Sequence, residues 1–170
     1  KRYDHFAHQG RKWLENRVEK LVEKDGSFSQ HSVMYHRVLL DTLIFVEYWR
    51  KKLGAAPFSA TFYDRASAAL DWMNSFTDTT SGHALNLGAN DGAMLLHAHA
   101  CDYRDFRPTI QTASVLFHGR KQYANGLWDE PGFWFGLQGD AAGAVVPVKT
   151  SKVLPGGYVV MAGENSWAVL

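Results

Sequence analysis

Residues 33–53 read VMYHRVLLDTLIFVEYWRKKL, and this stretch decides the fold class. When it is drawn as a helix, apolar side chains occupy almost every face, so it predicts a helix that is buried on several sides. Three cations at residues 50–52 gather at its C-terminal end, where they interact favourably with the helix dipole. Gly54 and Pro57 then predict the end of the helix and a short loop. A buried central helix needs other helices to cover it.

Further helices are expected on both sides of this one, because apolar residues recur there at helical spacing. The predicted ranges are about 5–24, 60–76 and 106–117, with a short aromatic helix near 128–137.

The spacing of apolar residues changes near residue 145, where β-branched residues and an alternating apolar pattern replace the helical pattern. Strands are expected at about 145–148, 158–161 and 167–170. Pro155-Gly156-Gly157 predicts a turn between them. The fold class is therefore mainly α. We expect residues 1–144 to form the C-terminal part of an incomplete α/α-toroid, and residues 145–170 to begin an antiparallel β-sandwich.

Composition and charge exclude several classes of function. The chain of 170 residues has a net charge of +1 and its basic residues are scattered, so no nucleic-acid partner is expected. Apolar runs are too short to cross a membrane, so no membrane partner is expected either. A single cysteine, Cys101, rules out an internal disulfide. Because Lys1 is not a Met and the sequence stops within an apolar run, we expect an internal piece of a longer protein.

The segment that carries chemistry is Asp-Gly-Ser-Phe-Ser-Gln-His-Ser-Val-Met-Tyr-His-Arg, residues 25–37. Ionisable side chains are dense there, at the mouth of an apolar helix, where they are costly unless they are used or hydrogen-bonded. One interpretation is a functional site. The other is helix capping by Ser32 with partly exposed polar neighbours. The residues alone leave both open.

Three segments resemble the heparinase II/III-like polysaccharide lyases, in the family's order. Asp25-Gly26-Ser27, Gln30, Ser32 and Tyr35-His36 match its loop at the head of a helix. Residues 86–93, Asn-Leu-Gly-Ala-Asn-Asp-Gly-Ala, are similar to the loop after its next helical hairpin, and Pro155-Gly156-Gly157-Tyr158 is similar to the entry to its β-sandwich.

The resemblance implies a lyase that cleaves uronic-acid polysaccharides by β-elimination. Tyr35 would be the general acid and possibly also the base, with His36 as a second catalytic residue. Cationic or hydrogen-bonding neighbours would tune the Tyr35 phenol. The candidate substrate-binding residues are Gln30, His31, Arg37, Asn90 and Asp91. For Asn90 and Asp91, shaping a turn is the alternative, because the family often has an acidic residue where Ala89 stands.

The same resemblance places other catalytic groups outside these residues. The family's carboxylate-neutralising Asn or His would precede Lys1, and its further catalytic His would follow Leu170. We therefore expect the 170 residues to be inactive alone, with the remainder of the chain and an acidic polysaccharide as partners. No cofactor is expected in this part, and a periplasmic or secreted location is implied.

Two further groups of residues have both a functional and a simpler structural interpretation. His97, His99 and Cys101 suggest a metal, but no second ligand cluster supports one. Arg104 or Arg107 could bind a substrate carboxylate, although helix-start electrostatics explains both.

The aromatic residues near the short helix, and two adjacent acids, suggest sugar chemistry of another kind. Trp128, Phe133, Trp134 and Phe135 could stack on sugars, although core packing is the favoured interpretation. Asp129 and Glu130 suggest a glycosidase, but adjacent carboxylates do not flank a scissile bond. A glycoside hydrolase on the same scaffold and a non-catalytic sugar-binding domain remain the alternatives.

Overall fold

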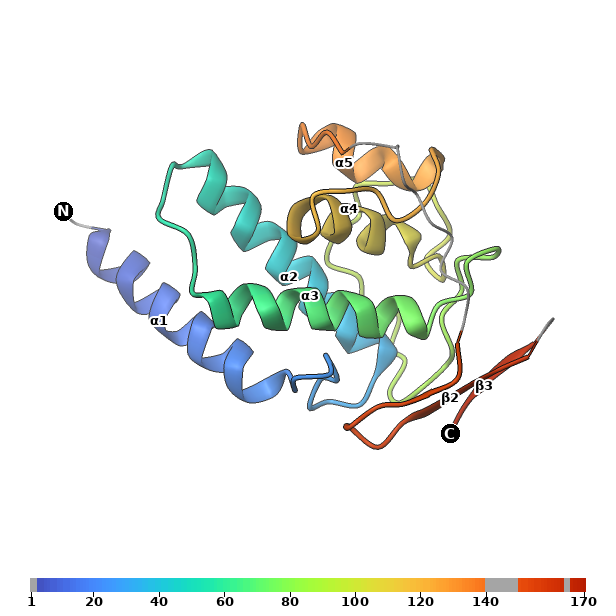
Figure 1. Ribbon diagram of the computed structural model, residues 1–170. Coiled ribbons are helices and arrows are strands. Elements are labelled where there is room, and N and C mark those ends of the chain that lie inside the picture. Colours follow the sequence, from blue (N-terminus) through green and yellow to red (C-terminus); the bar gives the residue numbers. More distant parts are fainter. Residues whose placement is uncertain (1–2, 140–149, 164–165) are drawn as a thin grey trace.

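The computed structural model describes residues 3–139, 150–163 and 166–170. Its helices are α1 (Asp4–Leu21), α2 (Val33–Lys52), α3 (Ala60–Ser75), α4 (Arg107–Phe117), the 3-10 helix η1 (Leu127–Asp129) and α5 (Glu130–Trp134) (Figure 1). All the helices predicted from the sequence are confirmed, with small shifts at their ends.

The first helix ends earlier than predicted because the chain turns back on itself. Val22 forms an isolated antiparallel bridge with Phe28, which takes the segment out of the helix. Gly26 sits at this turn with φ of 88°. A Cβ on Gly26 would lie 1.9 Å from the Ala68 carbonyl oxygen of α3, so only glycine allows this close approach.

Helix α2 forms the centre of the helical layer, as its sequence predicts. It packs against α3 and α4, and α3 also contacts α1. Leu40, Leu43 and Ile44 of α2 are completely buried. The Ser32 hydroxyl caps the helix by accepting a hydrogen bond from the Tyr35 N–H, so the predicted cap is confirmed.

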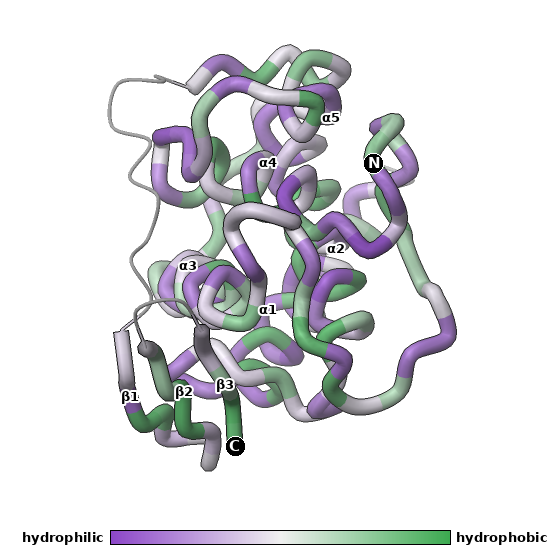
Figure 2. Tube along the Cα trace, turned by 90° about the vertical axis from the view of Figure 1, so that its right-hand side faces the viewer, coloured by the Kyte–Doolittle hydropathy of each residue, from purple (hydrophilic) through white to green (hydrophobic). Residues whose placement is uncertain are grey.

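The C-terminal residues form a small antiparallel sheet in the order β1 (Lys152–Val153), β2 (Val159–Ala162) and β3 (Trp167–Val169). The turn at 155–157 and the last two predicted strands are confirmed. Figure 2 shows that β2 and β3 are more apolar than β1.

The sheet shares the helical core, since Leu154 and Val160 belong to the same buried cluster as α2 and α3. The strand predicted at 145–148 and the expected domain boundary lie outside the described residues. Within the described residues the fold is mainly helical, with a small antiparallel sheet.

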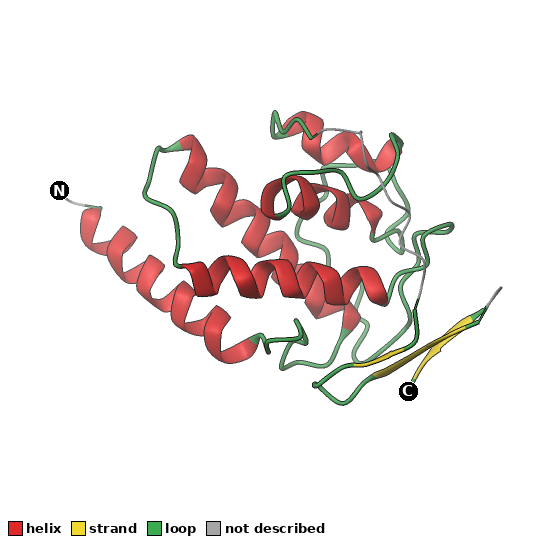
Figure 3. Ribbon diagram, in the orientation of Figure 1, coloured by secondary structure: helices red, strands yellow, loops and turns green. Residues whose placement is uncertain are grey.

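A long loop, residues 76–106, connects α3 to α4 with isolated bridges as its only β pairing (Figure 3). Loops of this length without their own helix or strand are uncommon in compact domains and often functional. None of the helices in the described ranges is both long and apolar enough to cross a membrane.

Candidate functional site

The three segments that carry the family resemblance meet at the N-terminus of α2. The Asp25 carboxylate accepts hydrogen bonds from the Ser27 N–H at 3.0 Å and from the Gly156 N–H at 2.6 Å. Partial burial acts to raise the pKa of Asp25, but these bonds and one from the Ser27 hydroxyl at 2.7 Å hold it below its usual value. His31 Nδ1 lies 2.9 Å from the Tyr158 hydroxyl. The first loop is therefore tied directly to the turn of the sheet.

The long loop is tied to the same helix end. The Ser32 hydroxyl donates to the Ala89 carbonyl at 2.6 Å, and the Val33 N–H donates to the Leu87 carbonyl at 3.0 Å. Gly88 has φ of 72°, and a Cβ there would lie 2.2 Å from the His31 carbonyl oxygen. Only glycine permits this backbone-to-backbone contact.

Tyr35 is half-buried, and its hydroxyl reaches across to the long loop. It donates a hydrogen bond to Asp91 Oδ2 at 2.8 Å, while Asp91 Oδ1 accepts from the Ala93 N–H at 3.1 Å. The hydrogen bond and the negative charge of Asp91 raise the pKa of the Tyr35 phenol. The same hydrogen bond lowers the pKa of Asp91. The phenol is thus protonated at neutral pH, and its proton is directed at Asp91.

His36 lies in the core and not beside Tyr35, which corrects the expectation that it is catalytic. Its side chain is 1% exposed and stacks on Trp72 at 4.4 Å between ring centroids. Its Nε2–H donates to the Ala69 carbonyl at 2.8 Å. Burial lowers the pKa of His36 to about 4. A neutral, enclosed imidazole holds α2 against α3 and is out of reach of a polymer in solvent.

Protonation of His36 is expected to destabilise the protein as the pH falls. The folded pKa of about 4 lies below the ordinary histidine value. The free energy of unfolding therefore has its full value above pH 6.5, the ordinary pKa of histidine in the unfolded chain. It falls by roughly 3 kcal/mol as the pH drops toward 4, because the unfolded chain takes up the proton first. Urea unfolding at several pH values measures this loss. His36→Gln, which does not titrate, should flatten the slope between pH 7 and 5, and an unchanged slope would contradict the assignment.

Arg37 is also buried, which corrects its assignment to substrate binding. Its side chain is 1% exposed, and its guanidinium donates to the Tyr103 carbonyl and to the Ala93 carbonyl, the latter at 2.9 Å. It also lies over the Phe106 ring at 4.5 Å. Arg37 therefore binds the backbone of the long loop. Burial lowers its pKa, and the charge of Asp41 acts in the opposite direction.

Asp41 has a matching role that the sequence analysis missed. It is fully buried, and it accepts hydrogen bonds from the Leu95 and Leu96 N–H groups and from the Thr109 hydroxyl. Burial raises its pKa, while the hydrogen bonds and Arg37 oppose that rise. A carboxylate four residues after an arginine in an apolar helix was the available signal. Arg37 and Asp41 together position the loop that carries Asp91.

The remaining predicted residues lie at the surface around Tyr35. Gln30 and His31 are exposed, and His31 has a left-handed backbone with φ of 48°. Asn90 is exposed, and its amide donates to Asn86 Oδ1 at 2.8 Å. Its own Oδ1 accepts from the Gly92 N–H at 3.3 Å, so Asn90 does shape the turn. These side chains lie within the segments that also place Tyr35 and Asp91.

A pocket of about 270 Å³ adjoins this region, between the start of α2 and the long loop. Its polar lining consists of His83, Asn86, Asn90, Tyr103 and Arg104. Its apolar lining comes from the beginning of α2, from residues 84–87 and from Phe106. The pocket thus combines hydrogen-bond donors and a cation with an apolar surface, as small-molecule sites commonly do.

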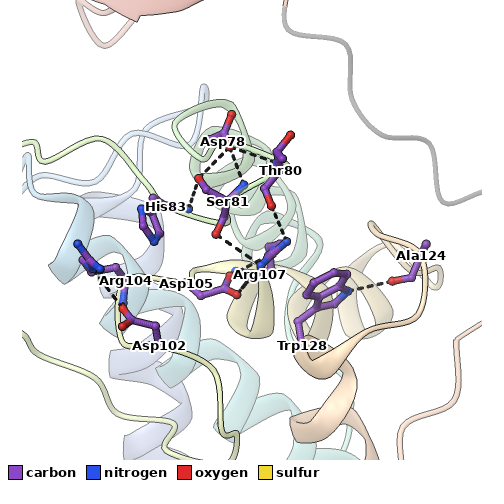
Figure 4. Close-up of polar contacts among 10 residues, drawn as sticks. All are labelled: Asp78, Thr80, Ser81, His83, Asp102, Arg104, Asp105, Arg107, Ala124 and Trp128. Carbon is purple, nitrogen blue, oxygen red and sulfur yellow. Dashed lines mark hydrogen bonds and ion pairs between the residues drawn. The ribbon is translucent and has the colours of Figure 1, made fainter.

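The two arginines weighed for carboxylate binding differ in their environments (Figure 4). Arg107 is fixed by an ion pair with Asp105 at 2.8 Å, and it also donates to the Thr80 carbonyl. It lies over the Trp128 ring at 4.0 Å. Arg104 is paired with Asp102 through Nε at 3.3 Å, with 58% of its side chain exposed. Arg107 is therefore structural, whereas Arg104 is accessible.

The metal interpretation gains no geometric support. Across the described residues, no group of three or more His, Cys, Asp or Glu side chains is placed to hold a metal ion. Burial lowers the pKa of His99 and raises the pKa of the Cys101 thiol.

The two adjacent acids are engaged in local structure. Asp129 accepts from the Gln111 amide and pairs with Lys121 at 3.0 Å. Glu130 accepts from the Ala100 N–H at 2.8 Å.

The aromatic residues near α5 divide into two groups. Trp128 and Phe135 pack against the core, as favoured from the sequence. Phe133 and Trp134 are instead 76% and 63% exposed, so core packing was the wrong interpretation for them. Pro131 is the buried residue of this five-residue helix, which leaves its two aromatic rings exposed.

Comparisons with known proteins leave the family open. No protein-family model matches the sequence, and neither a curated protein nor a solved structure matches the chain. The heparinase II/III-like resemblance therefore stays a prediction from its three motifs.

Proposed function

We propose that this chain carries one side of the active site of a polysaccharide lyase, which cleaves glycans containing uronic acids by β-elimination. The observation that carries the proposal is the Tyr35 phenol. It is accessible, protonated and hydrogen-bonded to Asp91 at 2.8 Å, where the three motif-bearing segments meet. In this proposal Tyr35 is the general acid.

The chemistry requires a base, an acid and a neutralised carboxylate. The base removes the proton at C5, a double bond forms between C4 and C5, and the bond from C4 to the glycosidic oxygen breaks. The Tyr35 O–H exchanges its hydrogen bond to Asp91 for one to the leaving oxygen, which then takes the proton, since an alkoxide is a stronger base than a phenolate. Because Asp91 raises the pKa of Tyr35, this environment favours the acid role over the base role.

The complete site extends beyond these residues in the proposal. By the family resemblance, the carboxylate-neutralising group and a further catalytic histidine belong to parts of the chain before Lys1 and after Leu170. The α/α-toroid, the β-sandwich, the periplasmic or secreted location and the inactivity of the 170 residues alone are proposals on the same basis.

A non-catalytic sugar-binding domain is the second candidate. The observation that favours it is the pair of exposed rings, Phe133 and Trp134, whose centroids lie 5.4 Å apart. Exposed aromatic faces stack on the apolar C–H faces of sugars without any chemistry.

To test the proposal, the complete protein is incubated with a panel of uronate polysaccharides and the ultraviolet absorbance is recorded. We expect ultraviolet absorbance from the unsaturated uronate product. New reducing ends without this absorbance would favour a glycoside hydrolase. Binding without either signal would favour the sugar-binding domain, and no binding to any acidic polysaccharide would contradict both candidates.

A further inference from the structure

We infer that the pocket beside Arg104 is a subsite for a second acidic sugar unit, adjacent to the unit cleaved at Tyr35. The inference deepens the proposed function and rests on it for the identity of the polymer. It names the ligand as a pyranose that carries an anionic group, either a carboxylate or a sulfate ester.

The charge in this pocket is available to a ligand. Among the described residues, the Arg104 side chain is hydrogen-bonded through Nε to Asp102 at 3.3 Å, which leaves its two Nη groups for a ligand. The fork of Nη groups matches the two oxygens of a carboxylate or sulfate. Asp102 also accepts from the Arg104 backbone N–H at 2.8 Å, and it lies outside the pocket lining. Asp102 thus orients Arg104 and offsets part of its charge.

Arg107 provides a contrast within the same fold. Its guanidinium donates to Asp105 and to the Thr80 and Ser81 carbonyl groups (Figure 4). Only 14% of its side chain is exposed. Arg107 therefore holds the loop at Thr80 and Ser81, whereas Arg104, three residues earlier, lies at the pocket wall.

The rest of the lining suits a sugar ring. His83, Asn86 and Asn90 supply hydrogen-bonding groups for hydroxyls, and Tyr103 is 49% exposed. Leu85 and its apolar neighbours supply a surface for C–H groups. A pyranose has the same division between polar edges and apolar faces, and a volume of about 270 Å³ is slightly below the smallest drug-sized ligand pockets, as expected for a single sugar ring.

The position of the pocket relative to Tyr35 determines which sugar unit it takes. Asn90 of the pocket immediately precedes Asp91, the hydrogen-bond partner of Tyr35. Arg37 fixes the other wall by binding the Tyr103 carbonyl. The pocket and the Tyr35 phenol thus both adjoin the long loop, but Tyr35 does not line the pocket. This separation assigns the pocket to the unit next to the scissile bond.

The test uses monosaccharides, which no lyase can cleave, and the complete protein. D-glucuronate, a D-glucose sulfate ester and neutral D-glucose are titrated while the Arg104 side-chain Nε–H signal is followed by ¹⁵N NMR. We expect an anionic sugar to shift this signal and glucose to leave it unchanged. Arg104→Gln should weaken anionic binding by about ten- to a hundredfold, because a charged hydrogen-bond donor is lost. Since this variant lacks the Nε–H signal, binding to the variants is followed by the backbone N–H signals of Asn86 and Asn90, which line the same pocket. Arg120→Gln, another exposed arginine, is the matched control and should bind normally.

The outcomes distinguish a failure of the subsite inference from a failure of the lyase proposal. If only glucuronate or only the sulfate ester binds, the inference stands and the group is identified. Three results would overturn the inference. Glucose could bind as well as the anionic sugars do, no sugar could shift the signal, or Arg104→Gln could bind anionic sugars normally. Those results would leave the assay for unsaturated product untouched. Anionic binding that depends on Arg104, in a protein that forms no unsaturated product, would keep the subsite and overturn the lyase.

Discussion

Tyr35→Phe in the complete protein is expected to lower the rate of unsaturated product formation by about 10²–10⁴-fold, the usual contribution of a general acid. The substitution removes one hydroxyl, whose hydrogen bond runs to the exposed Asp91, so the packing at the start of α2 is retained. Ultraviolet absorbance under saturating polysaccharide measures the effect on turnover. Binding of the polysaccharide should change little, because the hydroxyl acts mainly in the transition state.

The control is Tyr48→Phe, which removes a hydroxyl from another half-buried tyrosine on α2, beside Phe135. Its turnover should equal that of the unmodified protein. A Tyr35→Phe protein that keeps full turnover would remove Tyr35 from the chemistry, even if the lyase activity itself is real.

Asp91→Asn tests independently whether Tyr35 is the general acid. The acid must be protonated, so activity is lost as the pH rises through the Tyr35 pKa. Asp91 raises that pKa through its hydrogen bond and charge. Removing the charge should therefore move the alkaline limb of the pH profile to lower pH. An unmoved limb would show that Asp91 does not act on the proton of Tyr35.

The helices could be predicted from local pattern, but the roles of neighbouring residues at the start of α2 could not. Consecutive helical residues point about 100° apart. Tyr35 therefore lies at the surface while His36 and Arg37 point into the core. Because the helix is apolar almost all round, its sequence pattern does not reveal which side faces solvent. Tertiary packing by α3 and the long loop decides it.

Contacts between distant segments were also beyond the sequence. Tyr158 packs edge-on against Trp72 at 5.6 Å and against Phe76 at 5.4 Å, while its hydroxyl meets His31. These residues come from the turn before β2, from α3 and its C-cap, and from the first loop. Motif resemblance placed the segments in order along the chain, but no local pattern specifies that they touch. The same holds for Phe133 and Trp134, since aromatic content does not determine burial.

Arg37→Met is expected to destabilise the folded protein by about 3–5 kcal/mol, because two hydrogen bonds from a buried charged group are lost, each worth about 1.5–3 kcal/mol. Methionine fills much of the same space but cannot donate to the Ala93 and Tyr103 carbonyl groups. The substitution also leaves the buried Asp41 carboxylate without its cationic neighbour. Urea unfolding at neutral pH measures the loss. Arg104→Met removes an arginine whose side chain is 58% exposed and should cost within about 1 kcal/mol.

A double-mutant cycle separates the charge from the lost hydrogen bonds. In the Asp41→Asn background no uncompensated carboxylate remains, so Arg37→Met should cost less there, with a coupling of about 1–2 kcal/mol. The two side chains lie one turn apart on α2, and each shifts the pKa of the other. Zero coupling would mean that Arg37 stabilises the loop through its hydrogen bonds alone. A loss below about 1 kcal/mol for Arg37→Met would contradict the buried anchor itself. Since the loop held by this anchor carries both Asp91 and the Arg104 pocket, a protein that loses it should also lose the alignment of Tyr35 with its partner.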